Sequence, residues 1–119
     1  MTINDPIRFC AGLWDWAILD GCFGETKIKP TDIDGFVERK GKFLAIETKA
    51  PEVEIPQGQE IMFKQMAKIG ITVFVVWGTT NTPTKLKIFY KNMIDGPLDC
   101  NTEYLRERVS NWFSFADKD

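Results

Sequence analysis

The sequence predicts an α/β fold in which a mixed β-sheet is flanked by helices. The chain has 119 residues, enough for one hydrophobic core, so we expect residues 1–119 to form a single domain. Two β-type runs, 32–37 and 43–48, flank a short polar turn, which is the pattern of a hairpin. A helical pattern at 57–68 then leads into the strongest strand, 72–77, and such a crossover favours a parallel strand pair. The expected element order is α-β-β-α-β-β-α.

The first expected helix covers residues 5–19. Its apolar residues recur at spacings that fit one broad helical face, namely Ile7, Leu13, Trp14, Ala17 and Ile18. Because Gly21 and Gly24 disfavour a longer helix, we expect it to end near Leu19.

The hairpin turn is expected within the polar segment 38–42. The run Phe43–Ile46 is apolar throughout, as in a strand that is covered on both faces. If the turn centres near residues 40–41, residues whose numbers sum to about 81 face each other across the hairpin. This register predicts two facing pairs, Asp34 with Glu47 and Asp32 with Lys49.

The second half of the chain supplies the remaining elements. In the helix at 57–68, one side is expected to contain Ile61, Met62, Gln65 and Met66. The strand 72–77 is β-branched or aromatic throughout, and a turn is expected at 78–83. The alternating segment 85–90 is typical of an edge or amphipathic strand, and a last helix is expected from Thr102 to about Phe113.

Composition excludes several kinds of chemistry. The chain contains no histidine, which removes Ser-His-Asp and Cys-His machinery and histidine-rich zinc sites. The formal net charge of −2 argues against a protein that coats nucleic acid by bulk charge alone. No apolar run approaches the roughly 20 residues of a membrane span, so we expect no membrane partner. The odd set of cysteines predicts reduced thiols in a cytoplasmic protein: Cys10, Cys22 and Cys100.

The facing acidic residues predict a site for a hard metal ion. Cross-strand neighbours lie about 5 Å apart at Cβ, and two carboxylates that close repel each other unless a cation or proton lies between them. Asp34 and Glu47 therefore suit Mg²⁺ or Mn²⁺, which take oxygen ligands and keep open positions for water and phosphate. Lys49, two residues beyond Glu47 on the same face, suits the charge that develops in phosphodiester hydrolysis.

These residues also carry a family resemblance. The segments 30–36 (PTDIDGF) and 46–49 (IETK) resemble the PD-(D/E)XK nuclease motif. Asp34 precedes Glu47 by 13 residues and Gln59 follows Lys49 by 10, spacings similar to those of the small virus-type replication-repair (VRR-NUC) nucleases. The resemblance covers roughly residues 14–77, and nothing beyond Tyr90 takes part in it.

The resemblance implies a role for each matching residue. It implies a restriction-endonuclease-like core, with Asp34, Glu47 and the backbone carbonyl of Thr48 as metal ligands. Lys49 would be the catalytic lysine, and Gln59 would position that lysine or the substrate. Relatives often add an acidic residue, for which the candidates are Asp15, then Asp20, and also Asp32. A solvated role for Asp15 and a strand-end role for Asp32 stay open, and the separation of Pro30 from Asp34 departs from the family motif.

The expected function is that of a Mg²⁺- or Mn²⁺-dependent DNA endonuclease. Small size and the spacings suggest, by resemblance, a phage or mobile-element enzyme of repair or recombination in a bacterial or phage-infected cytoplasm, acting on branched or junction DNA. Branched substrates need two active sites, which favours a homodimer. One alternative is a catalytically silent nuclease fold that acts as a DNA-binding or inhibitory protein. Another is an interaction subunit that uses an exposed aromatic tail, formed by Trp112, Phe113 and Phe115.

Overall fold

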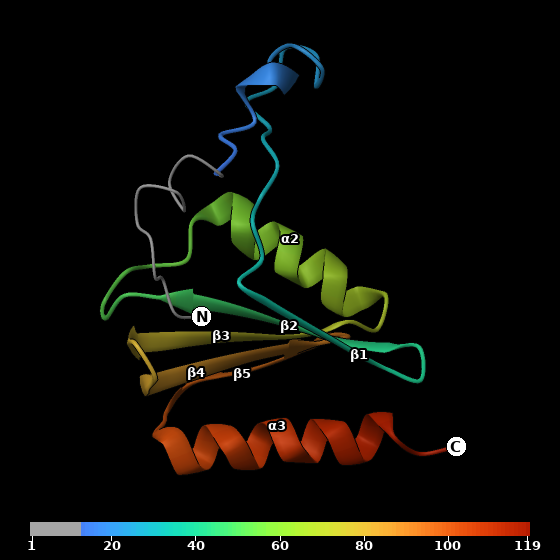
Figure 1. Ribbon diagram of the computed structural model, residues 1–119, viewed down its shortest axis with the longest axis vertical. Helices are drawn as coiled ribbons and strands as arrows, with labels where there is room; N and C mark the ends of the chain where they lie inside the picture. The colour runs from blue at the N-terminus through green and yellow to red at the C-terminus, as the bar shows by residue number, and fades with distance from the viewer. Residues whose placement is uncertain (1–12) are drawn as a thin grey trace. The chain divides into compact units, whose positions relative to one another are not determined.

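The computed structural model describes residues 13–119 and shows a five-stranded mixed sheet with one α-helix on each face (Figure 1). Contacts between residues divide the chain into two compact units, 1–32 and 33–119, which are described separately below. Among the described residues, no helix is both long enough and apolar enough to span a membrane. The predicted α/β class with a mixed sheet is confirmed.

The unit 33–119 contains all the strands and both α-helices of the described chain. In chain order, these elements are β1 (Gly35–Arg39), β2 (Lys42–Lys49), α2 (Gln57–Lys68), β3 (Thr72–Thr79), β4 (Thr82–Tyr90), β5 (Met93–Asp99) and α3 (Thr102–Ala116). The strands lie in the sheet in the same order as in the chain. Only β2 and β3 pair in parallel, and the other neighbours are antiparallel.

The hairpin β1–β2 has the predicted register. Its turn is formed by Lys40 (φ 50°) and Gly41 (φ 80°), and two successive positive φ angles are typical of the tight turn that matches strand twist. Gly35 pairs with Ile46, so the residue numbers of facing pairs sum to 81. The first strand begins at Gly35 rather than at Asp32, so the predicted start was wrong by three residues.

The parallel pair β2–β3 is joined by helix α2, as predicted. Parallel strands need a long crossover, and a helix is the usual one. Phe63 and Ala67 of α2 are buried against alternate residues of the sheet, and Met62 and Met66 of the same helix are partly buried. The predicted helix face was therefore wrong in part, because Ile61 and Gln65 are exposed.

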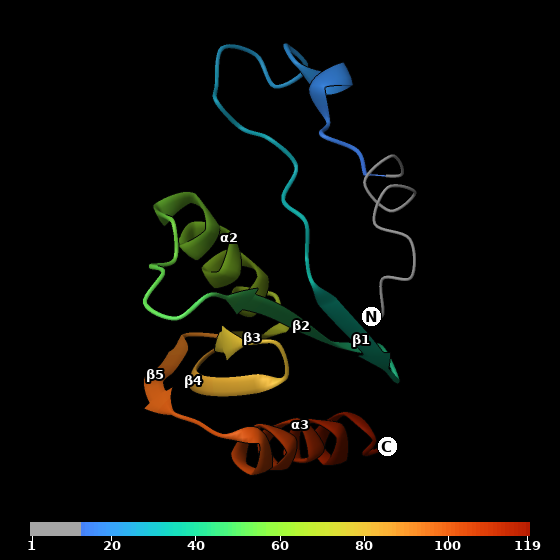
Figure 2. The same ribbon diagram turned by 60° about the vertical axis from the view of Figure 1, so that its left-hand side comes forward.

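Helix α3 covers the opposite face of the sheet, as the turned view shows (Figure 2). Its buried residues Trp112 and Ala116 pack with the other alternating set of strand residues, Leu44, Phe74, Val76, Leu86 and Ile88. Asn101 caps the helix, because its side chain accepts a 2.8 Å hydrogen bond from the backbone N–H of Tyr104. The predicted last helix is confirmed and extends three residues further.

Strand β5 was not predicted. It contains Gly96 and Pro97, which usually interrupt strands, but an edge strand tolerates proline because one side of its backbone has no strand partner. Because β5 is the edge, β4 lies inside the sheet, so the edge alternative for residues 85–90 was wrong. The predicted turn at 78–83 is also shorter, with only Thr80 and Asn81 between β3 and β4.

The unit 1–32 lacks the predicted first α-helix in its described part. The segment 5–12 lies outside the described residues, and residues 13–32 contain only the 3-10 helix η1 (Ala17–Leu19). Two α-helices rather than three are therefore found within residues 13–119. Trp16 has a left-handed conformation (φ 66°), which interrupts an α-helix, and residues 13–32 contain no strand on which an amphipathic helix could pack.

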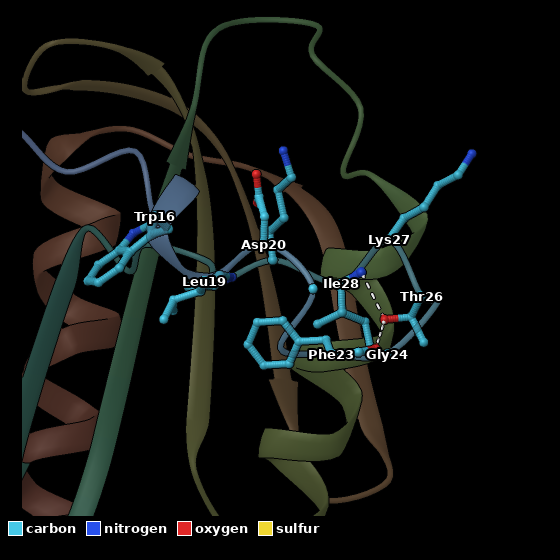
Figure 3. Close-up of a pocket in the computed structure, with 11 residues that line it drawn as sticks. Trp16, Leu19, Asp20, Phe23, Gly24, Thr26, Lys27 and Ile28 are labelled. Atoms are coloured by element: carbon cyan, nitrogen blue, oxygen red, sulfur yellow. Dashed lines mark hydrogen bonds between the residues drawn. The ribbon is translucent and has the colours of Figure 1, made fainter.

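The described part of this unit surrounds a hollow of about 440 Å³. Figure 3 shows Trp16, Leu19, Phe23 and Ile28 around it, with Thr26 linking the loop by accepting from Ile28 N–H and donating to Phe23 C=O. None of residues 13–32 is fully buried.

Candidate functional site

Asp34 and Thr48 join the approach to β1 to the end of β2. One Asp34 oxygen, Oδ2, accepts hydrogen bonds from the Thr48 N–H (2.8 Å) and the Thr48 hydroxyl (2.9 Å). These bonds fix the carboxylate next to Glu47, which precedes Thr48 in β2. Although Asp34 lies just before the first paired residue, Gly35, the predicted pairing of Asp34 with Glu47 therefore agrees with the geometry.

The environment of Asp34 favours its charged form. Partial burial alone would raise its pKa, but the opposing interactions outweigh burial, and the net pKa lies below its usual value. The main opposing interaction is the Thr48 N–H bond, followed by bonds with the Glu47 carboxyl and the Thr48 hydroxyl, and then by the charge of Lys49. Asp34 is thus held ionised beside a second carboxyl group.

Glu47 is a buried acid in an otherwise apolar strand. Its side chain is only 7% exposed, and its neighbour in β3 is Val75, which is fully buried. Its side chain forms a hydrogen bond with Asp34, so the two carboxyl groups lie within bonding distance. Placing a buried acidic group beside a second acidic group is costly unless a proton or cation lies with them.

Lys49 and Gln59 connect the end of β2 to the first turn of α2. The Lys49 ammonium donates a 2.6 Å hydrogen bond to Oε1 of Gln59. Lys49 lies on the same face of β2 as Glu47, because side chains alternate along a strand. The predicted association of Lys49 with Gln59 is therefore present in the structure.

An ion pair lies in the same helical turn. Lys87, on β4, donates a 3.0 Å hydrogen bond to Glu60, which follows Gln59. This bond and the positive charge of Lys87 lower the pKa of Glu60. In register, Lys87 faces Val75, which in turn faces Glu47, so Glu47 and Lys87 lie on the sheet face that α2 covers.

Sequence reasoning did not find the pairing of Glu60 with Lys87. Lys87 belongs to an alternating row of lysines in 85–91, a pattern that is common in solvated strands. For Glu60, the sequence indicates only a position near the start of a helix. The pair depends on two elements that are distant in sequence. Only knowledge of the sheet order brings them together.

The loop after Lys49 is fixed by a tryptophan. The indole N–H of Trp77 donates a 2.6 Å hydrogen bond to the carbonyl of Val53, and the Val53 N–H bonds to the Ala50 carbonyl. Trp77 is buried and pairs with Lys49 in the β2–β3 register. Trp77 therefore packs in the core and also positions the segment between the site and α2.

The three candidates for an additional acid, Asp15, Asp20 and Asp32, all belong to the unit 1–32 and are described within it. Asp15 accepts a 2.9 Å hydrogen bond from the Ala17 N–H at the start of η1, and Asp20 lines the hollow of the first unit. Asp32 is exposed at the end of that unit. Within residues 13–119, no group of three or more histidine, cysteine, aspartate or glutamate side chains is arranged to hold a metal ion.

The donor set at Asp34 and Glu47 nevertheless fits one type of ion. It provides two carboxylates, and the main chain of Thr48 adds a carbonyl oxygen next to them. A cation that is satisfied by one or two carboxylates, with water and phosphate oxygens completing its shell, is Mg²⁺ or Mn²⁺. A zinc site would need nitrogen or sulfur ligands, and the chain has no histidine.

Comparison of the chain with protein-family models, curated proteins and solved structures found no match.

Proposed function

We propose that this protein is a divalent-metal-dependent nuclease that hydrolyses phosphodiester bonds of DNA at the site formed by Asp34, Glu47, Thr48, Lys49 and Gln59. The observation that carries the proposal is the placement of the ionised Asp34 and the buried Glu47 side by side, with Lys49 held by Gln59 on the same face. An isolated surface Glu-x-Lys pair would have neither the burial nor the partners.

Each residue of the proposed site would have its own role in hydrolysis. When bound, Mg²⁺ or Mn²⁺ would neutralise the phosphate and lower the pKa of a water molecule. Asp34 and Glu47 would hold the ion, and the two Thr48 donors, both bonded to Oδ2, orient the Asp34 carboxylate. In the reaction, the oxygen of water forms a bond to phosphorus, the bond to one ester oxygen breaks, and the released alkoxide takes up a proton.

Lys49 is suited to the charge that develops on phosphorus. Its ammonium can donate to a non-bridging phosphate oxygen or to the attacking water, since it has three N–H donors and Gln59 occupies one. The bond to Gln59 limits the rotamers of a flexible side chain before substrate arrives. A hydrogen bond that holds the Lys49 side chain in position before the substrate binds would therefore raise the rate of hydrolysis.

The test is cleavage of supercoiled, linear and four-way-junction DNA with Mg²⁺ or Mn²⁺. The wild type should nick at least one substrate, whereas Glu47→Gln and Lys49→Met should each lose at least a hundredfold, as is typical when transition-state electrostatics are removed. Matched controls are Glu103→Gln and Lys64→Met, which change exposed residues of α3 and α2. Cleavage that is unchanged in both site variants would refute the proposed site.

A catalytically silent nuclease fold that binds DNA is the second candidate. Within residues 33–119, no third acidic side chain joins Asp34 and Glu47 in a group that could hold a metal ion, and this small ligand set favours the silent fold. It predicts DNA binding without cleavage and no Mn²⁺ binding in calorimetry. Mn²⁺ binding that depends on Glu47 would favour the nuclease instead, whatever DNA substrate is chosen.

A further inference from the structure

The hollow that borders Lys49 is built from the end of β2 and the turn between β3 and β4. It has a volume of about 570 Å³, and the residues that matter here are Thr48, Lys49, Gly78, Thr79, Thr80 and Asn81. Parallel strands β2 and β3 both end at this edge of the sheet, the usual position for ligand sites in open α/β sheets. The hollow therefore lies directly beside the proposed catalytic lysine.

The lining of this hollow has a distinctive chemistry. No carboxylate lines it, although the chain has more acidic than basic residues. It offers the hydroxyls of Thr79 and Thr80, the amide of Asn81 and one ammonium, whereas the Thr48 hydroxyl already donates to Asp34. A smaller hollow on the α3 side of the sheet also lacks carboxylates and shares four lining residues with it, Thr48, Gly78, Thr79 and Asn81. These two neighbouring hollows are together called the groove below.

The other hollow beside the loop after Lys49 has the opposite character. It is lined by Glu52 and Glu54 as well as Trp77 and Lys85. A phosphate passing within a few ångströms of these two carboxylates would be repelled by their negative charge. A polyanion that reaches Lys49 is thus favoured along the β3–β4 turn and disfavoured along the acidic loop.

We infer that the groove along Thr79–Asn81 receives the sugar–phosphate backbone of the DNA strand that is cleaved, and that the β3–β4 turn is the substrate-positioning element. This inference rests on the proposed nuclease function and adds the path of the substrate. Contacts of hydroxyl and amide groups with phosphates position a nucleic acid without reading its sequence. Recognition here depends mainly on neutral donors, so binding should depend only weakly on salt.

The backbone of the turn supports this role. Gly78 has φ +155° and lies at an irregularity in the β3–β4 register, and a Cβ atom there would overlap the carbonyl oxygen of Thr82. The close crossing of the two strands leaves the turn residues at the rim of the groove, where Asn81 takes a left-handed conformation (φ 54°). Asparagine, aspartate and glycine all tolerate that conformation, which makes Asn81 suitable for substitution.

The experiment measures binding of fluorescein-labelled DNA in Ca²⁺, with cleavage in Mn²⁺ assayed separately. Asn81→Asp should weaken binding roughly tenfold at low salt, because it places a negative charge beside a phosphate. Asn81→Gly, which removes the amide without backbone strain, should weaken it by a smaller factor. The matched control is Asn92→Asp, which makes the same change in the β4–β5 turn at the opposite end of β4.

The outcomes separate this inference from the proposed function. Equal binding by the Asn81→Asp and Asn92→Asp variants overturns the groove assignment, even if the wild type cleaves DNA. Selective loss of binding in Asn81→Asp supports the groove, even if no DNA is cleaved, in which case only the nuclease proposal falls. A wild-type protein that neither binds nor cleaves any DNA overturns both.

Discussion

The Nζ atom of Lys49 donates a 2.6 Å hydrogen bond to Oε1 of Gln59 and so joins the last residue of β2 to the first turn of α2. A lysine side chain has four rotatable bonds, and one fixed partner removes much of their freedom. In the proposed mechanism, this contact places the ammonium before DNA binds. Strand β2 and the first turn of α2 thus together determine where the Lys49 ammonium lies.

Removing the Gln59 amide should therefore lower catalysis more than binding. We expect Gln59→Ala to reduce kcat by about 10- to 100-fold with little change in KM, because a hydrogen bond to a charged group contributes about 1.5–3 kcal/mol. Steady-state cleavage kinetics give both constants. Gln65→Ala, on the exposed side of the same helix, is the control and should behave as wild type. Equal losses in the two variants would show that helix stability, not lysine position, is responsible.

Neutralising Glu47 should make the metal-free protein more stable. Glu47→Gln removes one of two adjacent acidic groups from a buried position, and we expect the free energy of unfolding in EDTA to rise by about 1 kcal/mol. In wild type, Mn²⁺ at a hundredfold excess over its Kd should add about 2.7 kcal/mol, and this gain should vanish in the variant. Thermal unfolding with and without Mn²⁺ measures both changes, and a variant that is less stable in EDTA would contradict the electrostatic account.

The ion pair of Glu60 with Lys87 should make stability depend on pH. The hydrogen bond from Lys87 lowers the pKa of Glu60 in the folded protein, so its contribution is fully present above the unfolded value of about 4.3 and is lost as pH falls through the lowered folded value. We expect Glu60→Gln to cost about 1 kcal/mol at pH 7 and almost nothing near pH 3. Urea unfolding at the two pH values measures this difference. Glu103→Gln, in the first turn of α3, controls for the helix dipole.

The aromatic tail should contribute to stability unevenly. Trp112 is buried in the core under α3, whereas Phe113 and Phe115 are 46% and 39% exposed. Truncating Trp112 to alanine should cost about 3–5 kcal/mol, and Phe113→Ala should cost less than about 1 kcal/mol. Denaturant unfolding of the two variants measures both losses in the free energy of unfolding. A small effect of Trp112→Ala would place that side chain outside the core and would revive the idea of an exposed aromatic interaction surface.

Much of the second unit could be predicted because local patterns and packing agree there. The apolar runs of β2 and β3 are long and β-branched or aromatic, and the turn at residues 40–41 determines the hairpin register. That register alone was enough to bring Asp34 to Glu47. The contact of Lys49 with Gln59 was expected from the family resemblance, which implied that Gln59 positions that lysine or the substrate.

The failures have physical causes as well. Within residues 13–32, the helical spacing before Leu19 meets no strand or second helix, and Trp16 takes a left-handed conformation that spacing cannot reveal. Strand β5 contains Gly96 and Pro97 and is stabilised by pairing with β4, a tertiary effect that overrides local preference. The pairing of Glu60 with Lys87 and the groove at Asn81 depend on sheet order, which no local pattern contains.

The two-residue turn at Lys40 and Gly41 gives the gene an unusual sensitivity to insertions. One extra codon in this turn would shift the pairing of β1 against β2 by one residue and reverse which side chains of β1 face α2. Asp34 would then lose its place beside Glu47, although the sheet could still form from the other strands. Loop length, normally free to drift on a protein surface, should here be under selection as strict as that on the acidic residues themselves.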